Sequence, residues 1–116
     1  MLRTVPELLA EVRAELRLLD AQAAMLEVAN NSGTVIDVRE PAEVQAKPAS
    51  ASVNIPRGVL EMLVTEKITD ADHPIYIHCA SGARATLAAE QLERIGYKSV
   101  TVISCPIDSV CEAQES

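Results

Sequence analysis

The chain of 116 residues contains no phenylalanine and no tryptophan, and only two tyrosines. Its core must therefore be built from aliphatic side chains. The chain also lacks the run of about 20 apolar residues that a membrane-spanning helix needs, and its charged N-terminus lacks the apolar stretch of a signal peptide. We therefore expect no membrane partner and a cytoplasmic location. An exported form whose signal has already been removed fits the same sequence.

Basic residues are few, and they do not cluster. Ten lysines and arginines face 17 aspartates and glutamates, which gives a formal net charge of −7 at pH 7. Binding to nucleic acid depends on grouped cationic side chains that neutralise phosphates. The composition therefore argues against a nucleic-acid partner.

Cysteine is present in an odd number, three, at positions 79, 105 and 111. This count does not fit a disulfide framework and favours a reducing compartment. No Cys-x-x-Cys pair or similar ligand spacing occurs, so we expect no metal site and no cofactor. His73 lies in a polar segment, where we expect it to be solvated, and we interpret His78 as a packing residue rather than a base.

The length and the alternation of apolar strands with helical patterns predict one α/β domain with a mostly parallel sheet. Residues 4–15 form the first predicted helix, with Thr4 and Glu7 as a capping box. Residues 16–19 fit either its end or a short strand, and Asp20 caps a second helix. Further predicted elements are strands from Thr34 and over residues 99–103, and a helix over residues 59–68. Residues 104–116 are treated as a cysteine-containing tail.

One stretch combines a strand, a cysteine, a short loop of small residues and a helix. Ile75–His78 has the β-branched and aromatic content of a buried strand, and Cys79 follows at its carboxyl end. Helical spacing begins after Gly82 and ends at Gly96, which is placed as a cap. The residues between the strand and the helix, together called the cysteine loop, are Ala80, Ser81, Gly82, Ala83 and Arg84.

A thiol attacks as its thiolate, and an unperturbed cysteine is only about 3% ionised at pH 7. Backbone N–H groups of the cysteine loop, curled at a helix N-terminus, would point at the sulfur, and the Arg84 guanidinium would add a full charge. Gly82 permits the positive φ that such a turn requires. A buried cysteine that only packs is the alternative. The arginine on the first turn of a convincing helix favours a reactive thiol and an anion-binding loop.

Three motifs, taken in order, resemble the single-domain sulfurtransferases of the rhodanese family. Residues 34–43 resemble the family's strand-to-helix signature around Asp37 and Arg39, residues 53–56 resemble the strand that follows, and residues 78–84 resemble the active-site loop. The resemblance covers roughly residues 16–102. It implies a three-layer α/β domain with helices on both sides of the sheet, with a core of about residues 16–103.

The resemblance also implies a chemistry. Cys79 would accept a sulfane sulfur from thiosulfate or a persulfide donor, hold it as a persulfide, and release it to a thiophilic acceptor. Ala80 to Arg84 would bind the substrate, and Asp37 and Arg39 would support the loop, although a structural salt bridge or a helix N-cap explains that pair at least as well. The implied partner is a small sulfur donor or a persulfide-carrying protein. Cys105 and Cys111 either relay the sulfur or have no role.

Two segments depart from the family pattern, and they keep other functions open. Residues 47–52 replace a Gly-His-Ile-Pro-Gly-like segment, and residues 104–111 lack the usual Gly-Gly turn before a further helix. A non-catalytic rhodanese-like module that binds a protein partner is therefore one alternative. A phosphatase or arsenate reductase on the same fold is another, but those enzymes have five residues between cysteine and arginine, whereas four separate Cys79 from Arg84.

Overall fold

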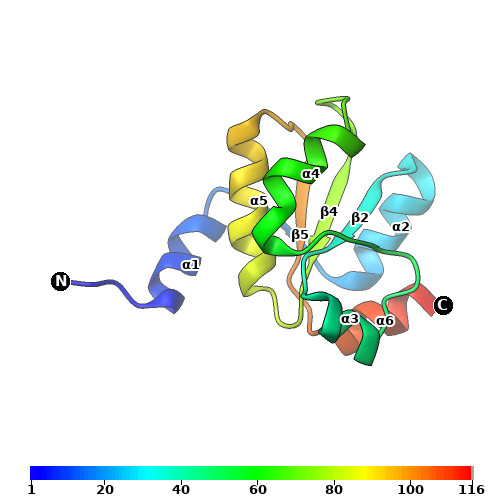
Figure 1. Ribbon diagram of the computed structural model, residues 1–116, viewed down its shortest axis with the longest axis horizontal. Coiled ribbons are helices and arrows are strands. Elements are labelled where there is room, and N and C mark those ends of the chain that lie inside the picture. The colour runs from blue at the N-terminus through cyan, green and yellow to red at the C-terminus, as the bar shows by residue number, and fades with distance from the viewer. Residues whose placement is uncertain (116) are drawn as a thin grey trace.

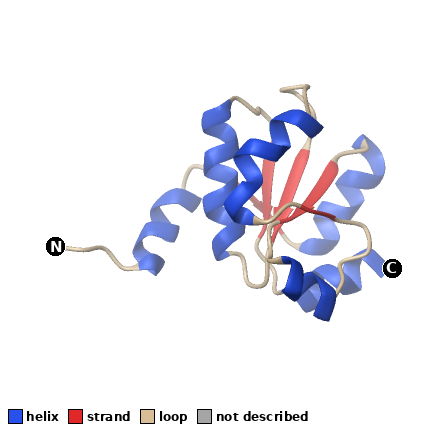
Figure 2. Cartoon of the chain, in the orientation of Figure 1, coloured by secondary structure: helices blue, strands red, loops and turns tan. Residues whose placement is uncertain are grey.

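The computed structural model describes residues 1–115. The strands are β1 (Arg17–Leu19), β2 (Thr34–Asp37), β3 (Val53–Asn54), β4 (Ile75–His78) and β5 (Val100–Ile103). The helices are α1 (Val5–Arg13), α2 (Ala21–Asn31), α3 (Pro41–Ala46), the 3-10 turn η1 (Arg57–Val59), α4 (Leu60–Lys67), α5 (Ala83–Ile95) and α6 (Ile107–Glu115). The strands form one sheet in the order β1-β5-β4-β2-β3, and all four pairings are parallel. Helices cover both faces of this sheet (Figure 1, Figure 2). The predicted α/β class and three-layer arrangement are confirmed.

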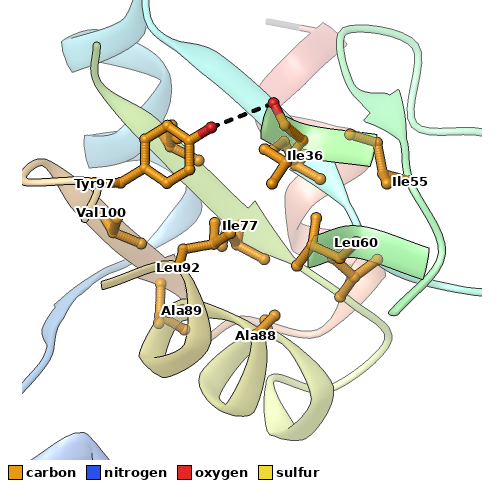
Figure 3. Packing of buried hydrophobic residues seen from close by; sticks show 14 of the residues in the cluster. Ile36, Ile55, Leu60, Ile77, Ala88, Ala89, Leu92, Tyr97 and Val100 are labelled. Atoms are coloured by element: carbon orange, nitrogen blue, oxygen red, sulfur yellow. Dashed lines mark hydrogen bonds between the residues drawn. The ribbon is translucent and has the colours of Figure 1, made fainter. Parts of the chain in front are cut away.

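Each face of the sheet has its own aliphatic core, because side chains alternate along a strand. Ile75 and Ile77 of β4 point toward α4 and α5, and Figure 3 shows Ile77 packed with Leu60 and Leu92. Tyr76 points to the opposite face, where it joins side chains of α2 and α6. Both tyrosines are buried, and aliphatic residues supply most of the rest of the core.

The helix ends follow the signals predicted from the sequence. Thr4 and Glu7 form a reciprocal capping box at the start of α1, and the Asp20 side chain accepts a hydrogen bond from the backbone N–H of Ala23 at the start of α2. Gly96 caps α5 with φ of +127°. Helix α1 ends two residues earlier than residue 15, and residues 17–19 form a strand, which decides between the two interpretations of that segment.

The segment treated as a tail is helical instead, and it belongs to the core. Helix α6 places Val110 and Ala113 against α2, so the core extends beyond residue 103. The neighbouring segment 47–52 packs on the same helix: the Gln114 side chain accepts from the backbone N–H of Ala51, and the Cys111 Sγ donates to the carbonyl of Pro48. The prediction of a tail is wrong for residues 107–115, because the tertiary contacts that stabilise this helix come from segments distant in sequence; residue 116 lies outside the described residues.

The parallel sheet brings the predicted site residues to one edge. Asp37 and His78 are register partners at the carboxyl ends of β2 and β4, and the backbone N–H of Val38 donates to the His78 carbonyl at 3.0 Å. Cys79 is the next residue of the chain. Helices α3, α5 and α6 follow β2, β4 and β5, so all three begin at this edge. Within residues 1–115, no helix is long and apolar enough to cross a membrane.

Candidate active site

Cys79 lies at the base of the cysteine loop, with only 1% of its surface exposed. Its Sγ accepts hydrogen bonds from two backbone amides, those of Gly82 at 3.1 Å and Ala85 at 3.4 Å. Both amides belong to the start of α5, where N–H groups lack partners within the helix and carry partial positive charge. The sequence predicted that amides of residues 80–84 would reach the sulfur. Gly82 does so, and Ala85 is a donor that the prediction did not include.

Gly82 adopts φ of +102°, which agrees with the positive φ predicted at this position. A side chain here would also lack space, because an added Cβ would lie 3.2 Å from the carbonyl oxygen of Ser104 and 3.1 Å from the Arg13 guanidinium. The loop is therefore enclosed by α1 on one side and by the segment after β5 on the other. This close packing fixes the direction in which the Gly82 N–H points.

Three residues that the sequence analysis did not single out hold the loop in place. The Thr86 hydroxyl donates to the Gly82 carbonyl at 2.7 Å, and Arg13 Nε donates to the Thr86 oxygen at 3.0 Å. The backbone N–H of Ile107 donates to the Ala80 carbonyl at 2.9 Å. Arg13 is separated from Thr86 by 73 positions along the chain, so no local sequence signal could have indicated the contact.

Arg84 is paired with a carboxylate. Its Nη1 and Nη2 contact the two carboxylate oxygens of Glu43 at 2.6 and 2.9 Å, and each side chain is 37% exposed. The hydrogen bonds from Arg84, followed by the backbone N–H of Glu40, lower the pKa of Glu43 to about 2, and the same ion pair raises the pKa of Arg84. The sequence predicted Arg84 as the cation of the loop. It did not predict a partner for that cation.

Asp37 and Arg39 form a buried ion pair with side-chain exposures of 1% and 3%. Arg39 Nε lies 3.0 Å from Asp37 Oδ1, and Nη2 lies 2.8 Å from Oδ2. The guanidinium also donates to the backbone carbonyls of Glu43 and Lys47. Hydrogen bonding to Asp37 raises the pKa of Arg39, and this effect is larger than the lowering of the pKa by burial. The pair thus connects β2 to backbone carbonyls within α3 and at its C-terminal end, and holds the helix that carries Glu43.

His78 lies on the opposite face of the sheet from Cys79, since it alternates with Ile77. Its Nε2 lies 2.7 Å from the Ser52 hydroxyl, which also accepts from Gln114 of α6. Within residues 1–115, its Nδ1 has no hydrogen-bond partner, and Asp37 Oδ1 lies 3.9 Å away. Burial lowers the pKa of His78. The neutral imidazole therefore anchors α6 and segment 47–52, as expected for a packing residue.

The other two cysteines belong to the α2 and α6 side of the sheet. Cys105 Sγ accepts from the backbone N–H of Ala21 at 3.3 Å and packs with side chains of α2 and α6, whereas Cys79 belongs to the core under α4 and α5. Cys111 contacts Pro48. All three thiols are free. Cys79 and Cys105 therefore belong to different clusters of the core.

Comparison with known proteins shows the family to which the chain belongs. The family model of the rhodanese-like domain matches residues 18–113, which includes α6. A Schizosaccharomyces pombe protein, provisionally named a mitochondrial thiosulfate sulfurtransferase, is 31% identical over 84 residues, covering 61% of this chain and 58% of that protein. The chain thus spans less than two thirds of the length of this relative.

Solved structures show the same architecture. The polysulfide-sulfur transferase homodimer of Wolinella succinogenes is 28% identical, with a TM-score of 0.76 over 91% of this chain and 80% of that chain. A Rhodopseudomonas palustris protein of unknown function, described as a possible tyrosine phosphatase, has a TM-score of 0.83 over 97% of this chain and 92% of that chain. Its identity of 22% indicates a shared fold only. The chain belongs to the family of rhodanese-like domains.

Proposed function

We propose that this protein transfers sulfane sulfur through a persulfide on Cys79. The observation that carries the proposal is the pair of hydrogen bonds from the Gly82 and Ala85 amides to the Cys79 sulfur. Hydrogen bonds to a charged acceptor are stronger than those to a neutral one, so these amides are placed to hold the sulfur while it attacks a donor. The N-terminus of a 13-residue helix is a position in which cysteines act as nucleophiles in other proteins.

The reaction has two steps. The Cys79 thiolate attacks the outer sulfur of a donor, the donor's sulfur–sulfur bond breaks, and the bonding pair leaves with the rest of the donor as a thiolate or as sulfite. A second nucleophile then attacks the outer sulfur of the persulfide and regenerates the Cys79 thiolate. In this scheme Ala80 to Arg84 bind the donor, and the buried pair of Asp37 and Arg39 supports the loop through α3. A small sulfur donor or a persulfide-carrying protein is the partner, and the cytoplasm is the expected location.

Intact-protein mass spectrometry tests the proposal. The protein is incubated with thiosulfate or with a thiol persulfide, and a mass gain of one sulfur atom is expected, mapped to Cys79 by peptide analysis. Cys79→Ser should abolish the gain. Cys105→Ser and Cys111→Ser are matched controls, because each removes one free thiol, that of Cys105 beside α2 and that of Cys111 in α6, and both should retain the mass gain. Full sulfur transfer by Cys79→Ser would refute the proposal.

The same variants separate the two alternatives. A non-catalytic binding module would show no sulfur loading on Cys79 with any donor. A phosphatase would hydrolyse an aryl phosphate with a rate that depends on Cys79. We favour sulfur transfer over phosphate chemistry because the loop closes on the sulfur with only four residues between Cys79 and Arg84, a ring better suited to one sulfur atom than to a tetrahedral phosphate.

A further inference from the structure

The carboxylate of Glu43 occupies the position on Arg84 that an anionic substrate would take. The end-on side of the guanidinium, formed by Nη1 and Nη2, could make a two-point contact with a sulfonate or phosphate, but both nitrogens contact the two oxygens of Glu43. The same carboxylate accepts from the backbone N–H of Glu40 at 2.9 Å as part of the capping box of α3. Glu43 is therefore fixed from two directions, and its contact with Arg84 is part of the resting site.

The pairing persists over the working range of pH. The pKa of Glu43 is lowered to about 2, so the carboxylate stays ionised until the solution is strongly acidic. The second guanidinium near the loop, that of Arg13, lies on the α1 side and donates to Thr86. To make the same two-point contact with Nη1 and Nη2 of Arg84, an incoming anion must displace Glu43.

Sulfur donors differ in how much they need such a cation. Thiosulfate carries two negative charges, and its sulfonate oxygens require a positive partner while sulfite departs. A thiol persulfide has no sulfonate group. We propose that Glu43 is a specificity-determining residue, an inference that rests on the proposed function. By occupying the Arg84 guanidinium, Glu43 weakens the binding of sulfonate-bearing donors and so favours thiol persulfides.

Both reactions balance with the Cys79 thiolate as the nucleophile. A persulfide R–S–SH gives Cys79–S–SH, and its sulfur–sulfur bonding pair leaves on R–S⁻. Thiosulfate gives Cys79–S–S⁻, and the corresponding pair leaves on sulfite. No net oxidant or reductant is consumed in either step. The difference that Glu43 makes lies in binding of the donor, so it should appear mainly in KM.

Glu43→Gln tests this inference with little disturbance of the fold. Glutamine retains an oxygen that can accept the Glu40 N–H and complete the capping box, but it removes the charge. We expect kcat/KM for loading Cys79 from thiosulfate to rise about fivefold, mostly through a lower KM, which is the effect of ~1 kcal/mol for a partly exposed ion pair. Loading from 2-hydroxyethyl persulfide should change less than about twofold on the same scale.

Two further variants isolate the cause. Glu66→Gln, on the exposed face of α4, removes the same charge far from the pair and should leave both donors unchanged. Glu43→Gln combined with Arg84→Gln should lose the gain with thiosulfate, because the released cation is then absent. An unchanged ratio between the two donors in Glu43→Gln would overturn the inference.

A titration with sodium sulfate tests whether Glu43 competes with anions for Arg84, and it requires no sulfur transfer. Sulfate should shift the amide NMR signals of Gly82 and Arg84 at a concentration about fivefold lower in Glu43→Gln than in the wild type. If the sulfate concentration at the midpoint of the titration is the same in Glu43→Gln and the wild type, Glu43 does not compete with anions for Arg84. Failure of all donors to load Cys79 would refute the proposed function instead, so the two failures are distinguishable.

Discussion

Replacing Gly82 by alanine tests whether the turn above Cys79 depends on a residue without a side chain. A φ of +102° is strained for alanine by about 1–3 kcal/mol. The new Cβ would also lie 3.2 Å from the Ser104 carbonyl, a backbone atom that cannot turn away. Crowding in a packed site adds about 1 kcal/mol or more. We therefore expect Gly82→Ala to lower the free energy of unfolding by about 2–4 kcal/mol.

Gly96 provides the matched control. It has φ of +127°, and within residues 1–115 no atom outside its immediate chain neighbours lies within 4 Å of its added Cβ. Gly96→Ala thus carries the backbone strain without the crowding, and it lies at the far end of α5 from Cys79. Urea unfolding of both variants, with slopes compared to exclude a change of the denatured state, measures the difference.

The rate of sulfur loading on Cys79 is the second measurement made on Gly82→Ala and Gly96→Ala. If the Gly82 N–H is turned away from Cys79, the thiolate loses a charge-assisted hydrogen bond of about 1.5–3 kcal/mol, equivalent to a ten- to hundredfold slower loading. Gly96→Ala should load at the wild-type rate. A Gly82→Ala variant that is as stable as Gly96→Ala and loads sulfur normally would show that the turn does not orient the amide.

Three further outcomes are expected. Arg39→Met should lower stability by about 3–5 kcal/mol in urea unfolding, because it leaves the Asp37 carboxylate buried without its partner. Because burial lowers the pKa of His78 in the folded state, the unfolded chain binds the extra proton, and stability should fall as pH drops below about 6.5, by at most ~1.4 kcal/mol per pH unit. Arg13→Ala should slow sulfur loading by releasing the loop, and Arg13→Lys should restore part of the rate.

Each of these outcomes has a contradicting result. Arg39→Met at wild-type stability would show that the buried pair contributes nothing net. If the free energy of unfolding of His78→Gln still falls between pH 7 and 5.5, the pH dependence belongs to another group. Glu43 cannot be that group, because its pKa is lowered in the folded state and it therefore affects stability only below about pH 4.5. Arg13→Ala with normal loading would mean that Thr86 alone holds the carbonyl of Gly82.

The local parts of the fold were accessible from the sequence because their determinants lie within a few residues of one another. The capping box of Thr4 and Glu7, the cap at Asp20 and the glycine cap of α5 each depend on contacts three or four positions apart. Helix α6 was missed for the opposite reason. Its burial against α2 and its hydrogen bonds to segment 47–52 join residues about 60 positions apart or more.

The sequence by itself determined that a cysteine would stand between a buried strand and a helix, with a glycine free to adopt a positive φ above it. Only the tertiary structure decided the charge around that cysteine. It brought Glu43 to Arg84 across 41 positions and Arg13 to Thr86 across 73. Hydrogen bonds and ion pairs depend on distance in space, and a parallel sheet gathers the ends of strands that lie far apart in the chain.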